Sequence, residues 1–100
     1  MEICENKNGT IRVIGKCSLA DAMGGIAKRF LAAASVHQRV VQVAEQTGDR
    51  IGRAAAEQRL QTALRRGSAF VKAAAAVPAS RRTEREVWDL RSETTIGDAP

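Results

Sequence analysis

The short segment Thr47-Gly48-Asp49 interrupts an otherwise continuous helix-forming sequence over residues 18–77. Glycine readily takes the left-handed conformation that ends a helix, and an aspartate directly after it can cap the next helix. Ser18 is a favourable N-cap for the first helix, and Pro78 stops the second. Helices joined by so short a connection lie side by side, so the sequence predicts an antiparallel helical hairpin with helices over about 19–47 and 50–77.

Alanine dominates the apolar positions of these helices. It supplies 18 of the 100 residues, whereas the larger side chains of Val, Ile, Leu, Met, Phe and Trp together supply 24. Alanine favours helix but buries little area, so such helices either pack very closely or share a core with another chain. We therefore expect a homodimer, or a complex with a partner protein, rather than a free monomer. A heptad-like seam is predicted from residue 23 to residue 51, at Met23, Ile26, Phe30, Ala33, His37, Val40, Ala44, Thr47 and Ile51.

Residues 1–17 carry the pattern of a β-hairpin. Asn8-Gly9 is the preferred pair for a two-residue type I′ turn, in which both residues have a positive φ. A turn there sets a register with one opposite-charge pair and two apolar pairs, which favours strand pairing. The predicted pairs are Glu5 with Arg12, Cys4 with Val13, and Ile3 with Ile14.

The same register bears on the two cysteines, Cys4 and Cys17. Cys17 lies four residues beyond the predicted partner of Cys4, or ~13 Å along an extended strand. A disulfide needs Cα atoms within about 7 Å, so the register disfavours a bridge. We interpret both thiols as small buried hydrophobic groups that stay reduced.

The C-terminal quarter predicts a third, shorter helix. Thr83-Glu84-Arg85-Glu86 matches the capping-box pattern, and Val87, Trp88 and Leu90 follow it. A polar, flexible tail is expected over 92–100. Altogether the sequence predicts a single, mainly α domain: an N-terminal β-hairpin, an antiparallel helical hairpin and a short C-terminal helix over 83–91.

The charge of the chain is concentrated in the second predicted helix. The net charge is +5 and the pI about 10.0, which favours nucleic acid or an acidic protein surface as a partner. Residues 49–79 carry six basic and two acidic side chains, or +4. Arginine outnumbers lysine 12 to 4, which is also typical of a GC-rich coding sequence, so a merely solvated basic face stays an alternative.

On an ideal helix, Arg50, Arg65 and Lys72 fall within about 60° of each other. Arg53 borders this arc, while Arg66 lies with Arg59 on a separate flank. The arc is a candidate phosphate-contacting ridge. The complete set of predicted nucleic-acid or partner-binding residues is Arg50, Arg53, Arg65, Arg66, Lys72, Arg81, Arg82, Arg85 and Trp88. Trp88 is interpreted either as core packing or as an anchor for a partner.

Enzymatic machinery is not indicated. His37 is the single histidine, and neither a nucleophile nor an orienting acid can be assigned to it. The two cysteines and this histidine lack zinc-ligand spacing, and Gly24-Gly25 lacks a phosphate-binding glycine pattern. We expect no catalytic residue, metal or cofactor. Charged residues interrupt the N-terminus, and no window reaches the ~20 apolar residues of a membrane span, so a cytoplasmic protein is expected.

Two functional hypotheses follow. The first is a small basic protein that binds nucleic acid, or a nucleic-acid-handling complex, in a regulatory or accessory role. The alternative is a protein–protein interaction module or small inhibitor, such as a phage or mobile element would encode, that docks on a host protein complex. The candidate phosphate-contacting ridge supports the first hypothesis, and the thin alanine core supports the second.

Overall fold

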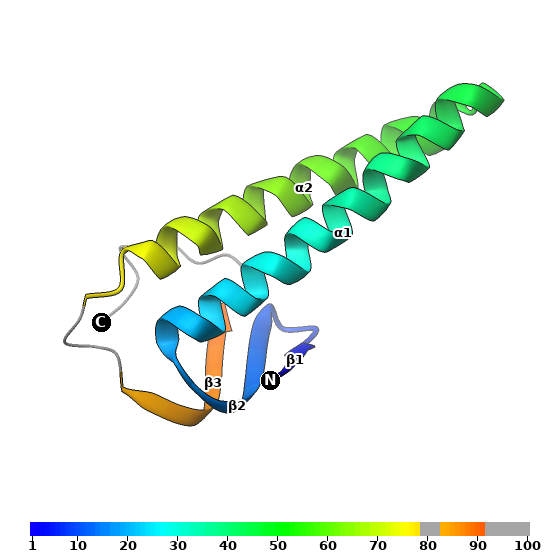
Figure 1. Ribbon diagram of the computed structural model, residues 1–100. Helices are drawn as coiled ribbons and strands as arrows, with labels where there is room; N and C mark the ends of the chain where they lie inside the picture. The colour runs from blue at the N-terminus through cyan, green and yellow to red at the C-terminus, as the bar shows by residue number, and fades with distance from the viewer. Residues whose placement is uncertain (79–82, 92–100) are drawn as a thin grey trace.

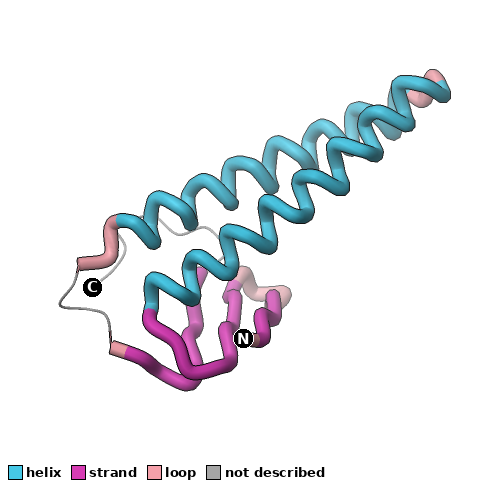
Figure 2. Tube along the Cα trace, in the orientation of Figure 1, coloured by secondary structure: helices cyan, strands magenta, loops and turns pink. Residues whose placement is uncertain are grey.

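Two long helices and a three-stranded sheet make up the part of the chain that the structure describes (Figures 1 and 2). The computed structural model describes residues 1–78 and 83–91, so Arg81, Arg82 and the predicted tail lie outside the described residues. In chain order the elements are β1 (Glu2–Glu5), β2 (Thr10–Ser18), α1 (Leu19–Thr47), α2 (Arg50–Ala75) and β3 (Glu84–Arg91).

The predicted helical hairpin is present, with its predicted caps. The Ser18 hydroxyl accepts a hydrogen bond from the Asp21 N–H at 3.2 Å. Gly48 has a φ of 73° at the C-cap of α1, and the Asp49 carboxylate accepts from the Gly52 N–H at 2.9 Å. These local contacts satisfy backbone groups at the helix ends, which is why the sequence alone located the turn.

The predicted short helix over 83–91 is wrong. This segment is strand β3, which pairs antiparallel with β2 and makes β2 the central strand of the sheet. Trp88 lies opposite Val13 and Leu90 opposite Ile11, and both pack against the core. Alternation with period two therefore determines the structure of this segment, and pairing with β2 overrides the capping-box pattern at its start.

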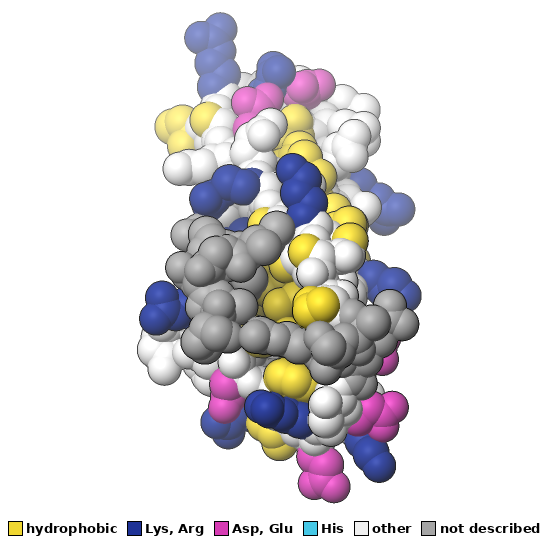
Figure 3. Space-filling model, turned by 90° about the vertical axis from the view of Figure 1, so that its left-hand side faces the viewer, with side chains coloured by type: hydrophobic (Ala, Val, Ile, Leu, Met, Phe, Trp, Pro, Cys, Tyr) yellow, Lys and Arg dark blue, Asp and Glu magenta, His cyan; other side chains and the backbone are white. Residues whose placement is uncertain are grey.

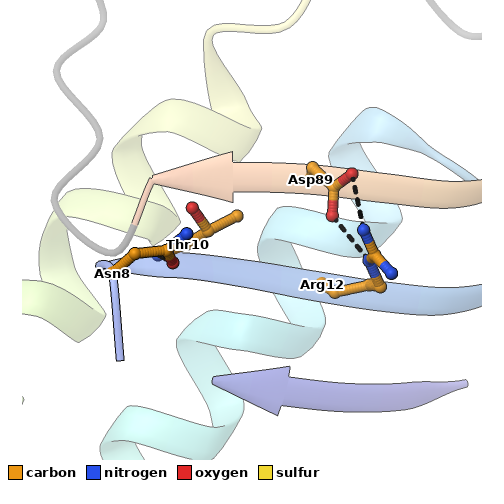
Figure 4. A network of polar contacts seen from close by, with 4 residues as sticks. All are labelled: Asn8, Thr10, Arg12 and Asp89. Atoms are coloured by element: carbon orange, nitrogen blue, oxygen red, sulfur yellow. Dashed lines mark hydrogen bonds and ion pairs between the residues drawn. The ribbon is translucent and has the colours of Figure 1, made fainter. Parts of the chain in front are cut away.

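The predicted hairpin register is also wrong, by one residue. Gly9 alone in this turn has a positive φ (83°), because the connection is a three-residue loop. The Asn6 N–H donates to the Thr10 carbonyl at 2.8 Å, and the Gly9 N–H donates to the Asn6 carbonyl at 3.2 Å. The Thr10 N–H also donates to the Asn8 side chain at 3.1 Å; Figure 4 shows these two residues. A type I turn followed by a left-handed glycine gives this hairpin.

Shifting the register by one residue moves side chains to the other face of the sheet. Ile3 lies opposite Val13, and Cys4 lies opposite Arg12. Val13 is fully buried, so Ile3 joins the core while Cys4 lies on the face turned away from the helices. The core thus determines the register more strongly than the preferred turn type does.

The outward face of the sheet carries an ion pair between β2 and β3. Arg12 Nε donates to Asp89 Oδ1 at 2.8 Å, and Arg12 Nη2 donates to Asp89 Oδ2 at 3.4 Å (Figure 4). The hydrogen bond with Asp89 raises the pKa of Arg12, and the hydrogen bond from Arg12 lowers the pKa of Asp89. Both side chains are about half exposed, so the pair positions β3 more than it stabilises the fold.

The large core side chains are all at the sheet end of the hairpin. Phe70, Ile11, Ile26 and Val13 are almost completely inaccessible, and the Phe30 and Phe70 rings stack with centroids 6.0 Å apart. Farther from the sheet the buried contacts between the helices are small, at Ala34, Val41, Ala44, Ala56 and Ala63.

The predicted seam of α1 is only partly correct. Met23, Ile26 and Ala44 are buried, but Val40, Thr47 and Ile51 are exposed. The hairpin extends well past the sheet in a molecule of 52 × 23 × 21 Å (Figure 1). None of the described helices has the length and apolarity required to cross a membrane.

Phe70→Ala tests whether this one-sided core holds the fold together. Truncating a fully buried phenylalanine removes contacts to both the sheet and α1, so we expect a loss of about 3–5 kcal/mol in the free energy of unfolding. Val71→Ala is the matched control, because Val71 is the next residue and is half exposed; its effect should stay within about 1 kcal/mol. Urea unfolding followed by circular dichroism measures both, and equal losses would contradict the arrangement of the core.

Alkylation of the two thiols tests the observed register. Cys4 is partly accessible on the outward face, whereas Cys17 is 6% exposed and burial raises the pKa of its thiol. Iodoacetamide at pH 8 should therefore modify Cys4 at least about tenfold faster than Cys17. Peptide mapping by mass spectrometry gives both rates. Equal rates, or a bridge between Cys4 and Cys17, would be incompatible with cysteines on opposite faces of the sheet.

Candidate nucleic-acid interface

Helix α2 places three of the predicted basic residues on one exposed face. Arg50, Arg65 and Lys72 are all exposed, and they lie on the side of α2 opposite the buried Ala56 and Ala63. Because α2 is one continuous helix, the 22 residue steps from Arg50 to Lys72 span about 33 Å. We call Arg50, Arg65 and Lys72 the α2 ridge.

Arg53 borders the ridge but is engaged by two carboxylates. Its Nη2 lies 3.0 Å from Glu45 Oε1 of α1, and its Nε donates to Glu57 Oε1 at 3.0 Å. All three side chains are about half exposed, so each pair contributes at most about 1 kcal/mol. The two pairs balance the charge of Arg53 and link α1 to the start of α2.

Arg66 lies on a different side of the helix, about 100° around the axis from Arg65. Its guanidinium lies 5.8 Å from the centre of the Phe30 ring, and its Nη1 is 3.6 Å from Glu5 Oε1 of the sheet. The Arg66 Nε is buried and has no hydrogen-bond acceptor among the described residues. Arg66 thus belongs to the face of the hairpin next to the sheet and not to the ridge.

Arg85 and Trp88 are brought together on β3, away from the ridge. The Arg85 guanidinium lies 4.8 Å from the centre of the Trp88 ring, a cation–π distance. The Trp88 indole N–H donates to the Cys17 carbonyl at 2.8 Å, and the ring packs against the core. The structure therefore supports the core-packing interpretation of Trp88, although part of the ring stays accessible.

The sequence did not predict a groove that lies between the sheet and the face of the helical hairpin next to it. The groove has a volume of about 550 Å³ and an apolar floor that includes Ile3 and Phe30. Arg29, Arg59 and Arg66 line it, and Glu5 is the one carboxylate among its described lining residues. Arg59 and Arg66 are seven residues apart, which is a spacing that places them on one side of a helix. Arg29 could not be added from the sequence, because its position depends on how α1 crosses the sheet.

At the sheet end of the molecule, the basic side chains do not form one dense patch. Figure 3 looks from the sheet end of the molecule and shows Lys and Arg side chains at several separate places around it. A band of apolar atoms is visible between them. On α2, Arg50 and Lys72 are about 33 Å apart, so the ridge offers a polyanion charges spaced along a helix rather than a dense patch.

His37 lines the groove, and the residue pattern assigns no nucleophile to it. Within residues 1–78 and 83–91, no group of three or more His, Cys, Asp or Glu side chains is arranged to hold a metal ion. Comparison of the chain with protein-family models, curated proteins and solved structures found no match. The function is therefore inferred from the geometry of these residues.

Proposed function

We propose that this protein is a non-enzymatic nucleic-acid-binding protein with an accessory or regulatory role, and that the α2 ridge contacts phosphates. The observation that carries the proposal is the charge of α2. This helix has six basic residues and one acidic residue, Glu57, and Glu57 is hydrogen-bonded to Arg53. The ridge therefore presents a net positive face.

The dimensions of the ridge support a duplex as the ligand. Arg50 and Lys72 are about 33 Å apart along the axis, and one turn of duplex DNA is about 34–36 Å. A straight helix lying along the duplex can therefore reach phosphates one turn apart. Arginine and lysine at such positions give affinity that is independent of base sequence and strongly dependent on salt.

A second candidate function is supported by a different observation. The distal part of α1 exposes valines on the side next to the groove, and apolar stripes of this kind are typical of protein interfaces. Docking on a protein complex, as a regulator or small inhibitor would do, is therefore the alternative. A homodimer stays a prediction of the same class.

A salt titration with labelled duplex DNA tests the ridge. Each phosphate contact contributes about −0.9 to the slope of log affinity against log salt. Replacing Arg50, Arg65 and Lys72 together by Gln should flatten that slope by up to about three units. The helix should remain folded, because glutamine is a good helix former.

The matched control replaces Lys28, Arg39 and Arg59 by Gln. These residues are exposed and lie off the ridge, and replacing all three by Gln removes the same net charge as the ridge variant. Their triple variant should keep most of the wild-type slope. The absence of binding at 50 mM salt, or the same flattening in both triple variants, would count against the ridge as a phosphate-binding site.

A further inference from the structure

One face of α1 changes from buried to exposed where the sheet ends. Ala22 and Ile26 are 0% and 1% exposed and belong to the core formed with β2. The next residue along this face of the helix is Arg29, which donates a hydrogen bond from Nη1 to the carbonyl of Ile3 in β1. Steps of three and four residues continue this face beyond the sheet, at Ala33, Val36, Val40 and Val43.

These valines are only about half covered by the described part of the chain. Val36, Val40 and Val43 are 59%, 46% and 57% exposed. We call these three residues the valine stripe. A surface of this kind costs free energy in water, and on soluble proteins it typically marks an interaction site.

Basic residues border the stripe on both sides. Arg39 lies on the outer side of α1, about 60° around the helix from Val36. Arg59 and Arg66 line the adjoining groove from α2. Apolar side chains between two basic borders are complementary to a segment with an apolar face and acidic flanks.

We propose that the valine stripe and the groove dock an amphipathic α-helix of a partner protein, one whose flanks carry aspartate or glutamate. From Val36 to Val43 the stripe extends about 10 Å, or roughly two turns. At its sheet end the groove of about 550 Å³ is large enough for a bulky anchoring side chain. The partner helix would contact the stripe and the groove through apolar side chains at positions i, i+3, i+4 and i+7.

Charge complementarity favours an acidic helix over the two other candidate occupants of the stripe, which are a second copy of this chain and a nucleic acid. A second copy would bring its own basic borders against those of the first, so like charges would meet along the interface. A nucleic acid would match the arginines but would leave the valines without apolar contacts. An acidic amphipathic helix satisfies both features.

Arg66 has a specific part in this interface. Its Nε is buried without an acceptor among the described residues, and its contact with Glu5 is long at 3.6 Å. A carboxylate arriving from the groove would pair with a guanidinium that the Phe30 ring already orients. The proposal does not depend on the α2 ridge, which lies on another face of the hairpin.

Two synthetic 18-residue helical peptides test the proposal against the full chain. Both carry leucines at the same three- and four-residue spacing; one has glutamates on the flanks and the other has lysines. Fluorescence anisotropy should show that the glutamate peptide binds at least about tenfold more tightly than the lysine peptide. Comparable affinity for both peptides would overturn the proposal.

Val40→Thr and Val71→Thr form a matched pair of variants. Val40 and Val71 are 46% and 50% exposed, and the substitution is the same, but Val71 lies on α2 away from the groove lining. Val40→Thr should weaken binding of the glutamate peptide at least about fivefold, because a hydroxyl replaces a methyl that the bound peptide would bury. Val71→Thr should leave affinity within twofold, and equal losses would place the peptide elsewhere and overturn the proposal.

Arginine variants and competing ligands complete the test. Arg66→Gln should weaken the glutamate peptide, while Arg50→Gln on the ridge should not. If light scattering at 100 µM gives twice the mass of the single chain, and Val40→Thr abolishes this dimer, then a second copy of the protein occupies the stripe. Displacement of the peptide by duplex DNA would assign it to nucleic acid. Either of these last two results overturns the proposal without deciding whether the ridge binds phosphates.

Discussion

Burial of Phe70 in the cluster formed by Ile11, Val13 and Ile26 is the interaction on which the rest of the structure depends. It joins the C-terminal half of α2 to the central strand and to the start of α1. Because Ile11 and Val13 face this cluster, Ile3 of β1 and Leu90 of β3 must face it too. One apolar contact region thereby determines the register of both strand pairs.

The same concentration of large side chains at one end shapes the other end of the molecule. Beyond the sheet, the helices meet through alanines and Val41, so their backbones approach closely and little side-chain area is buried. Two faces of the hairpin carry the side chains of the two proposals. The α2 ridge is polar and basic and runs along the whole of α2, and the valine stripe is apolar with basic borders and lies beyond the sheet. Each face suits a different class of partner, which is why the proposed functions can be tested separately.

Local signals made much of this fold predictable from the sequence. Ser18, Gly48 and Asp49 act through contacts with neighbouring backbone, so the helix ends were correctly located. The strand pairing was not predictable in the same way. Asn8-Gly9 favoured a two-residue turn and Thr83 to Glu86 favoured a helix, but burial of side chains distant in the sequence prevailed at both places.

The candidate site shows the same division. Arg50, Arg65 and Lys72 share a face because helical spacing alone puts them there, so the sequence sufficed to group them. Assigning Arg53 to two carboxylates, or Arg66 to Phe30 and Glu5, requires knowing how the helices and sheet pack. Arg29 could be assigned to the groove lining only from the structure, in which it contacts β1.

Amide hydrogen exchange of the full chain tests most directly whether the sheet covers only one end of the helical hairpin. Local opening is easiest where few apolar contacts are buried. Amides at Ile26 and Phe70 should therefore exchange at least about 100-fold more slowly than those at Val40 and Gln58, which lie in the same two helices. Uniform protection along α1 and α2 in the isolated chain would contradict a core confined to the sheet end.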